Sequence, residues 1–136
     1  MTWLLDTNAC VSYLRLGSDS KIAQRLGERN AEDVVLCSVV RAELLFGAMR
    51  SSRATENLAK VRQFLSQFAS LPFDDDAAET YGRIRADLTG RGVTIGPNDL
   101  LIAAIAQTND TTLITHNVDE FSRVAGLKIE DWEAED

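Results

Sequence analysis

The chain has 136 residues, close to the commonest length of one domain, so we expect a single domain over residues 1–136. Its apolar content of 45% and charged content of 26% are ordinary globular values and argue against general disorder. No apolar run is long enough for a membrane span, and no basic region precedes the first apolar residues as in a secretory signal. Cys10 and Cys37 have neither metal-ligand spacing nor the density of a disulfide framework, which favours a reducing cytoplasm.

The net charge of −7 is unevenly distributed along the chain. Residues 1–70 contain nine Lys/Arg and seven Asp/Glu, whereas residues 71–136 contain five and fourteen. This distribution excludes a broad basic face for nucleic acid. A polyanionic ligand would have to meet local arginines, bound cations or a basic partner. Five of the last seven residues are acidic, which is typical of a solvated tail.

Apolar runs and helical spacings alternate along the first half of the chain. Short continuous apolar runs are typical of buried strands, and apolar residues three or four positions apart are typical of helices. Ser38 stands where the N-cap of a helix is expected. In chain order these patterns predict a strand at Thr2–Leu5, helices at Asn8–Leu16 and Asp19–Arg29, a strand at Val34–Cys37, and helices at Val39–Arg50 and Thr55–Phe68.

The second half continues the alternation around an unusually apolar helix, which should be buried on most sides. Its predicted elements are a strand at Leu71–Phe73, a helix over about Ala77–Gly90, the apolar helix Asp99–Gln107, a strand at Thr111–Thr115, a short helix at Val118–Arg123 and a last strand at Leu127–Ile129. Strands that alternate with helices predict an α/β fold. We expect three layers, with a central parallel sheet of four to five strands and helices on both faces.

Polar residues follow several of these strands. Asp6 comes directly after the first strand, and Glu43 lies about one turn into the helix that follows the second strand. Asp99 begins the apolar helix, and residues 117–120 follow the strand that ends at Thr115. Ligands of an open parallel sheet bind beyond the carboxyl ends of its strands. We therefore expect these polar groups to lie together at one edge of the sheet.

Each of these residues also has a structural interpretation when it is considered alone. Asp6 could cap the first helix, and Asp99 could favour the first turn of its own helix. Glu43 could be an ordinary exposed glutamate. Asn117 could cap the following helix, and Glu120 could be surface charge. Their joint placement at one sheet edge favours the functional interpretation.

Clustered carboxylates have a chemical consequence. Three of them within a few ångströms cannot all stay ionised unless a cation neutralises them. Mg²⁺ or Mn²⁺ suits such a site, because both prefer oxygen ligands and share their coordination with waters and substrate phosphate. Such a site hydrolyses phosphodiesters by lowering the pKa of a bound water and stabilising the leaving oxygen. No Cys/His cluster competes for zinc, and no phosphate-binding glycine loop is present.

Four motifs, in this order, resemble those of the PIN-domain ribonucleases. They are LLDTN (residues 4–8), SVVRAEL (residues 38–44), GPNDLLIA (residues 96–103) and LITHNVDEF (residues 113–121). The ending RVAGLKIEDW (residues 123–132) looks like that of the VapC toxins of type II toxin–antitoxin systems. The resemblance spans essentially the whole chain. It implies a PIN-like fold and an endoribonuclease toxin that acts in the cytoplasm.

The resemblance also implies roles for individual residues. Asp6 and Asp99 would be ligands of Mg²⁺ or Mn²⁺, and Glu43 would complete the set as a ligand or by orienting metal-bound water. Asn8 and Thr115 would be polar support. Many PIN domains have aspartate at the position of Asn117, which leaves the fourth carboxylate open. Asn117 could bind through its amide oxygen, while Glu120 or Asp119 supplies the charge. We favour Glu120 as the fourth catalytic acid, because the Glu-Phe pair fits the motif.

The partners that the resemblance implies are an RNA substrate and a VapB-like antitoxin. The most similar-looking branch cleaves initiator tRNA in the anticodon region. An inhibitory antitoxin segment, basic or apolar, would lie along a groove of the toxin, and the toxin would form a homodimer and toxin–antitoxin hetero-oligomers. Local arginines are candidates to contact RNA phosphates, although each could instead form a surface ion pair. These candidates are Arg15, Arg41, Arg50 and Arg53.

Two other functions remain open at this stage. A catalytically silent PIN-like module could bind RNA or protein without cleaving. A phosphatase of the haloacid dehalogenase type also begins with an aspartate after its first strand. That chemistry requires a second aspartate two residues later, where this chain has Asn8.

Overall fold

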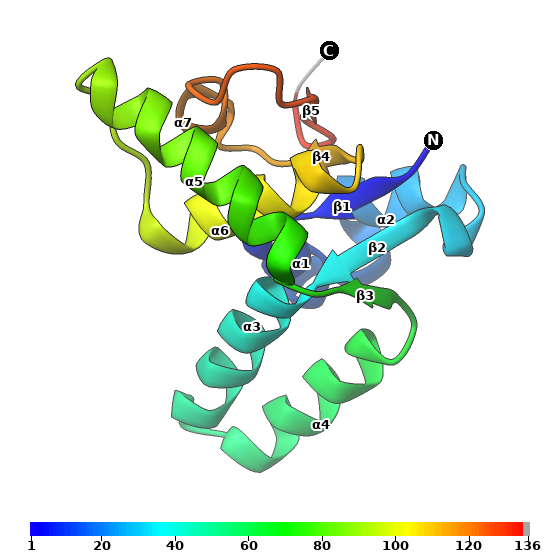
Figure 1. Cartoon of the computed structure of the whole chain (residues 1–136). Helices are drawn as coiled ribbons and strands as arrows, with labels where there is room; N and C mark the ends of the chain where they lie inside the picture. Colours follow the sequence, from blue (N-terminus) through cyan, green and yellow to red (C-terminus); the bar gives the residue numbers. More distant parts are fainter. Residues whose placement is uncertain (135–136) are drawn as a thin grey trace.

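A five-stranded parallel sheet forms the centre of the molecule, in the order β3-β2-β1-β4-β5 (Figure 1). The computed structural model describes residues 1–134. Its strands are β1 (Trp3–Leu5), β2 (Val34–Cys37), β3 (Ala69–Leu71), β4 (Thr112–Ile114) and β5 (Ile129–Glu130). The chain runs outward from β1 to β3 and then returns to place β4 on the other side of β1. The strand order therefore reverses between β1 and β4, which is where open α/β sheets bind ligands.

Helices cover both faces of the sheet, which confirms the predicted three-layer α/β fold (Figure 1). The two helical layers are α1 and α2 on one face of the sheet and α5 and α6 on the other (Figure 1). Helices α3 and α4 pack against each other beyond the carboxyl ends of the strands. The helices are α1 (Thr7–Leu16), α2 (Lys21–Gly27), α3 (Ser38–Arg50), α4 (Ala54–Leu65), α5 (Asp75–Gly90), α6 (Pro97–Thr108) and α7 (Val118–Phe121).

Helix α6 confirms the expectation of a helix that is buried on most sides. Its residues 102–106 are all buried, and it packs against α5, α3 and β4. Pro97 occupies the first turn, where its missing N–H costs no hydrogen bond. This burial fixes the position of Asp99, which lies in the same first turn.

Several predicted boundaries were wrong. The short helix predicted at Val118–Arg123 ends at Phe121, and the last strand lies at Ile129–Glu130 rather than Leu127–Ile129. Ser20 accepts the Ala23 N–H and starts α2, so the predicted Asp19–Arg29 helix is shorter and follows a 3₁₀ turn at Gly17–Asp19. Helix α4 ends at Leu65, and the chain turns early enough to place β3 at Ala69–Leu71 rather than Leu71–Phe73. Ser38 is the first residue of α3 rather than its cap, and its hydroxyl donates to the Leu71 carbonyl at 3.4 Å.

The C-terminal segment (residues 130–134) is not the solvated tail that its charge predicts. Trp132 is only 3% exposed. The Arg29 guanidinium lies over both rings, 4.5 Å from that of Trp132 and 4.6 Å from that of Trp3, and the two ring centroids are 6.3 Å apart. Cation–π contact and apolar burial therefore fix this segment against the start of β1. The remaining acids of the predicted tail, at 135 and 136, lie outside the described residues.

No helix within residues 1–134 is both long enough and apolar enough to cross a membrane.

Candidate active site

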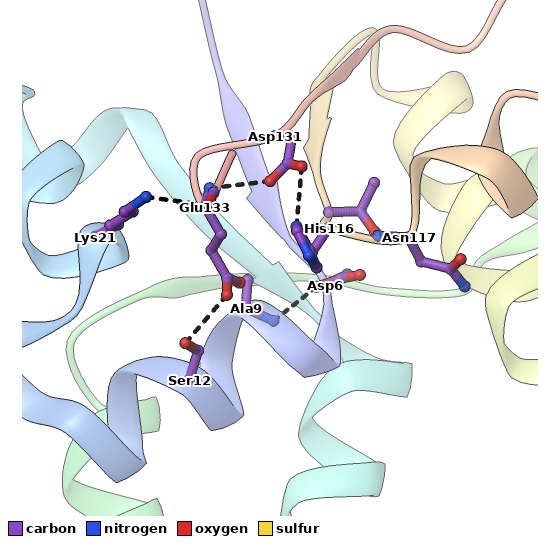
Figure 2. A network of polar contacts seen from close by, with 9 residues as sticks. Asp6, Ala9, Ser12, Lys21, His116, Asn117, Asp131 and Glu133 are labelled. Carbon is purple, nitrogen blue, oxygen red and sulfur yellow. Dashed lines mark hydrogen bonds and ion pairs between the residues drawn. The ribbon is translucent and has the colours of Figure 1, made fainter. Parts of the chain in front are cut away.

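Asp6 lies at the carboxyl end of β1, beside β4. Its backbone N–H donates to the Ile114 carbonyl at 3.0 Å, and its carboxylate accepts the Ala9 N–H at 2.8 Å, so it does cap α1 (Figure 2). The side chain is nevertheless only 3% exposed. Burial raises the pKa of Asp6 to about 6, against hydrogen bonds from Thr115 and Ala9, and the charges of Glu133 and Glu43 raise it further. The cap and the candidate ligand are therefore the same residue.

Asp99 and Glu120 come together from α6 and α7. Burial raises the pKa of Asp99 to about 7, and contact with Glu120 and the charges of Asp6 and Glu43 add to the shift. Glu120 accepts the Gly96 N–H at 2.5 Å and the side-chain amide of Asn117. Asp119 is exposed, whereas Glu120 is half-buried beside Asp99. The structure thus brings Glu120 rather than Asp119 to the acid cluster.

Gly96 permits this approach of the two acids. A Cβ atom at this position would lie 3.3 Å from Asp99 Oδ2 and 3.4 Å from Glu120 Oε1. The first separation is tighter than ordinary van der Waals contact and the second is at its limit, so a Cβ atom here would require the Asp99 carboxylate to move by a few tenths of an ångström. In the sequence, Gly96 stands only as the first residue of the GPNDLLIA motif, and no role of its own was predicted for it. The signal that could have identified it is its position three residues before Asp99.

Glu43 approaches the cluster from α3. Its Oε1 accepts a hydrogen bond of 2.7 Å from the Thr7 hydroxyl, which leaves Oε2 free of that contact. The charge of Glu43 raises the pKa of both Asp6 and Asp99, which places all three carboxylates within electrostatic reach of one another. Thr7 was not among the predicted support residues. Its place in the LDTN motif was the available signal.

Of the three residues predicted to support the acids, Thr115 and Asn117 contact the cluster and Asn8 does not. Thr115 is fully buried, interacts with the Asp6 carboxylate and accepts the Asn117 N–H at 2.9 Å. Asn117 makes no side-chain cap for α7 and instead donates its amide to Glu120. Asn8 is exposed on α1, and nothing in the described structure links its side chain to the cluster. We define the acid cluster as Asp6, Glu43, Asp99 and Glu120.

The acid cluster has the chemistry of a divalent cation site. None of the ion pairs found within residues 1–134 includes any of its four carboxylates. Unneutralised carboxylate oxygens, two of them with raised pKa values, suit a hard cation such as Mg²⁺. Among the described residues, no three His, Cys, Asp or Glu side chains converge closely enough to form a ligand set alone. The donor set fits an ion that keeps several waters, as Mg²⁺ does.

A groove leads away from Glu43 between α1, α3 and α4. It has a volume of about 320 Å³, and its walls include the apolar side chains of Val11, Leu14 and Val61. Arg15 and Lys60 lie along it as cations. Lys60 was missed in the sequence, because only the packing of α4 against α3 and α1 brings it there.

The other predicted arginine contacts lie elsewhere. Arg41 donates to the Leu65 carbonyl at 3.4 Å, and the Arg50 guanidinium lies 5.6 Å from the Phe46 ring. Arg53 is 3.7 Å from the Glu56 carboxylate on an exposed surface. Of the four candidates, Arg15 is the one that lines the groove beside the acid cluster. The contact of any of the four with RNA stays a prediction.

The parallel three-layer fold, with carboxylates gathered where the strand order reverses, agrees with comparison to known families. The PIN domain model matches residues 3–127. Ribonuclease VapC2 of Rickettsia felis is 36% identical over 98% of this chain and 99% of its own length. The tRNA(fMet)-specific endonuclease VapC of Salmonella typhimurium is 35% identical over 97% of this chain and 98% of its own. The chain therefore belongs to the PIN domain family, in its VapC branch.

Solved structures agree with this assignment. DNA-bound VapBC from Salmonella typhimurium superimposes with a TM-score of 0.91 and 35% identity, covering 97% of this chain and 98% of that one. VapBC2 from Rickettsia felis, bound to a DNA fragment from its promoter, gives a TM-score of 0.88 and 34% identity, covering 97% and 99%.

Proposed function

We propose that this chain is an endoribonuclease toxin of the VapC type, dependent on Mg²⁺ or Mn²⁺ and inhibited by a cognate VapB-like antitoxin. The observation that supports this most strongly is the acid cluster, whose carboxylates come from four separate parts of the chain and have no basic partner among the described ion pairs. Folding does not require such a cluster, since buried unpaired charge is costly.

Each acid has a distinct part in phosphodiester hydrolysis. Asp6 and Asp99 would hold the metal ion, which when bound lowers the pKa of a water and stabilises charge on the leaving oxygen. Glu43 Oε2 would accept a proton from the attacking water, because Oε1 is already engaged by Thr7. Glu120, held by the Gly96 N–H and the Asn117 amide, would supply the fourth negative charge beside Asp99.

The proposed substrate is initiator tRNA, cleaved in the anticodon region. Similarity to the tRNA(fMet)-specific endonuclease of Salmonella typhimurium supports this choice over bulk RNA. The net charge of −7 agrees with it, because non-specific RNA binding depends on cationic contacts with phosphates. Such an enzyme would select its target by shape and by an exposed loop.

The antitoxin would place an apolar segment with a basic residue in the groove between α1, α3 and α4. Apolar walls suit that segment, and Glu43 at the end of the groove would attract the basic residue. For a homodimer, α3 offers Phe46 and Met49, which are 60% and 54% exposed. We place the complex in the cytoplasm, which suits RNA cleavage and two buried free cysteines.

The experiment that tests this function is cleavage of initiator tRNA by the purified protein in Mg²⁺ and in Mn²⁺. We expect a single major cut that EDTA abolishes and that added antitoxin suppresses. A catalytically silent binding module would instead retain RNA uncut in both metals. That result, with a folded protein and bound RNA, would contradict the proposed function.

A further inference from the structure

His116, the single histidine of the chain, lies at the rim of the acid cluster but has no part in the chemistry described above. Its two sequence neighbours both touch the cluster. Thr115 interacts with Asp6, and Asn117 donates to Glu120. Figure 2 shows the His116 ring between the C-terminal segment and the start of α1, with Asp6 and Asn117 beside it. The ring therefore lies next in sequence to two residues that contact the acid cluster.

The C-terminal segment holds one side of the ring in place. His116 Nδ1 lies 3.0 Å from Asp131 Oδ2 (Figure 2). Burial and a hydrogen bond hold the Asp131 side chain in place. It is only 17% exposed, and its Oδ1 accepts the Glu133 N–H at 2.9 Å. The adjacent Trp132 is buried against Arg29. Asp131 is thus a fixed acceptor for one nitrogen of the ring.

The other nitrogen of the ring is available to a ligand. An ionised carboxylate can only accept, so Nδ1 must bear the hydrogen of the Asp131 contact. In the neutral ring, Nε2 then keeps its lone pair and acts as an acceptor. The His116 side chain is 63% exposed, so solvent and substrate can reach it. The site therefore presents an oriented hydrogen-bond acceptor beside the acid cluster.

RNA has a matching donor that DNA lacks. The 2′-hydroxyl is both donor and acceptor, and it is the group by which proteins distinguish RNA from DNA at a given nucleotide. A neutral hydroxyl is also better suited than a phosphate to this rim, because Asp6, Glu120 and Glu133 give it negative charge. Among the groups of a ribonucleotide, the ribose hydroxyl fits this position best.

We propose that His116 Nε2 accepts a hydrogen bond from the 2′-hydroxyl of a nucleotide next to the cleaved phosphodiester, and that Asp131 positions the ring for it. This specificity role rests on the proposed endoribonuclease function. It makes cleavage sensitive to the ribose at one nucleotide, in addition to the shape of the RNA.

Two substitutions separate this role from a merely structural one. In His116→Asn, the amide nitrogen takes roughly the place of Nδ1 and keeps the Asp131 contact, but nothing replaces Nε2. In His116→Gln, the amide oxygen takes roughly the place of Nε2, and the Asp131 contact is lost. A structural role predicts that His116→Asn behaves as wild type and His116→Gln is impaired. The proposed role predicts that His116→Gln still recognises the ribose hydroxyl and that His116→Asn does not.

The decisive experiment uses initiator tRNA with single 2′-deoxy substitutions at the nucleotides that flank the cut. We expect one deoxy position to lower kcat/KM of wild type by about threefold to tenfold, the range of one hydrogen bond. His116→Gln should keep most of this sensitivity. His116→Asn should lose it while its Tm stays at the wild-type value. Equal sensitivity in wild type and His116→Asn would overturn the proposal.

A binding measurement decides the proposal independently of catalysis. In an Asp6→Asn background, fluorescence anisotropy compares an anticodon-loop oligoribonucleotide with the oligodeoxyribonucleotide of the same sequence. We expect His116→Asn to reduce the RNA preference and His116→Gln to retain it. An unchanged preference in His116→Asn would overturn this inference, whereas absence of any RNA cleavage by wild type would contradict the proposed function instead.

Discussion

Two helices of this molecule begin with the same aspartate cap, yet only one cap belongs to the acid cluster. Asp6 accepts the Ala9 N–H at the start of α1, and Asp74 accepts the Ala77 N–H at the start of α5, at 2.8 and 2.9 Å. Asp74 is exposed and is followed by Asp75 and Asp76 in the first turn, where the helix dipole favours negative charge. Asp6 is buried at the sheet edge, among acids from other elements.

The difference shows that capping alone does not make an active site. Both caps satisfy a backbone N–H, and both could be deduced from local sequence. Only Asp6 is buried where the strand order reverses, and this burial raises its pKa to about 6. Asp74 is therefore a matched control for Asp6.

The largest expected effect is on RNA cleavage by the two matched variants. Asp6→Asn keeps an oxygen that can cap α1 but removes the charge, so we expect a loss of at least about a hundredfold in kcat/KM. Asp74→Asn makes the same chemical change at α5 and should leave cleavage unchanged. Circular dichroism confirms that both variants are folded. Wild-type cleavage by Asp6→Asn would remove this residue from the site.

Stability should respond to pH and metal in a direction that the acid cluster sets. The pKa values of Asp6 and Asp99 are raised from 3.8 to about 6 and about 7, so the folded state binds more protons than the unfolded state between these values. The free energy of unfolding therefore falls as pH rises through this range. In EDTA, we expect the Tm to drop by a few degrees between about pH 5 and pH 8.

Saturating Mn²⁺ should reverse that drop, because a ligand of the native state stabilises by mass action. In EDTA at neutral pH, Asp99→Ala should equal or exceed the wild-type Tm, since one repelling charge is gone. The surface ion pair of Asp110 and Lys128 does not contribute to the drop in Tm between about pH 5 and pH 8. Lys128 lowers the pKa of Asp110, so this pair affects stability only in more acidic solution. Identical melting curves with EDTA and Mn²⁺ would argue against a clustered acid site.

A smaller effect is expected for substitution of Glu120, the fourth acid of the cluster, on the metal dependence of cleavage. Glu120→Gln should raise the Mn²⁺ concentration for half-maximal cleavage by about tenfold, because Glu120 supplies charge beside Asp99. Asp119→Asn is the neighbouring control, and its exposed side chain should leave the metal dependence unchanged. A larger shift in Asp119→Asn would reverse the assignment.

The smallest expected effect comes from Gly96→Ala. The added methyl group would crowd Asp99 and Glu120, so we expect a loss of a few fold in kcat from displaced carboxylates. Gly82→Ala in α5 is the control, because a Cβ atom there meets no heavy atom within 4 Å and alanine favours a helix. If the two variants cleave equally well, the close approach of Asp99 and Glu120 to Gly96 is not important for catalysis.

Much of this arrangement could be predicted from sequence because local patterns determine it. Continuous apolar runs identified β1, β2 and β4, and the polar residues that follow them identified the edge of the sheet. Asp6, Glu43 and Asp99 were predicted as site residues in this way. Glu120 was chosen over Asp119 from its place before Phe121, and the structure puts Glu120 beside Asp99.

The rest depended on contacts between distant parts of the chain. Residues 69 and 70 of the edge strand β3 are exposed, so apolarity could not mark its boundaries. The bond from Thr7 to Glu43 joins residues 36 positions apart. The packing of Trp132 on Arg29 and Trp3 joins the two ends of the chain, and charge composition alone predicted a solvated tail there.

The central claim is that the acid cluster, and not acidic surface in general, binds the divalent ion that RNA cleavage requires. Calorimetric titration of Mn²⁺ into wild type, Asp6→Asn and Asp74→Asn tests it most directly. We predict saturable binding by wild type and Asp74→Asn, and a loss of at least about tenfold in affinity for Asp6→Asn. Equal Mn²⁺ affinity in all three proteins would contradict the claim.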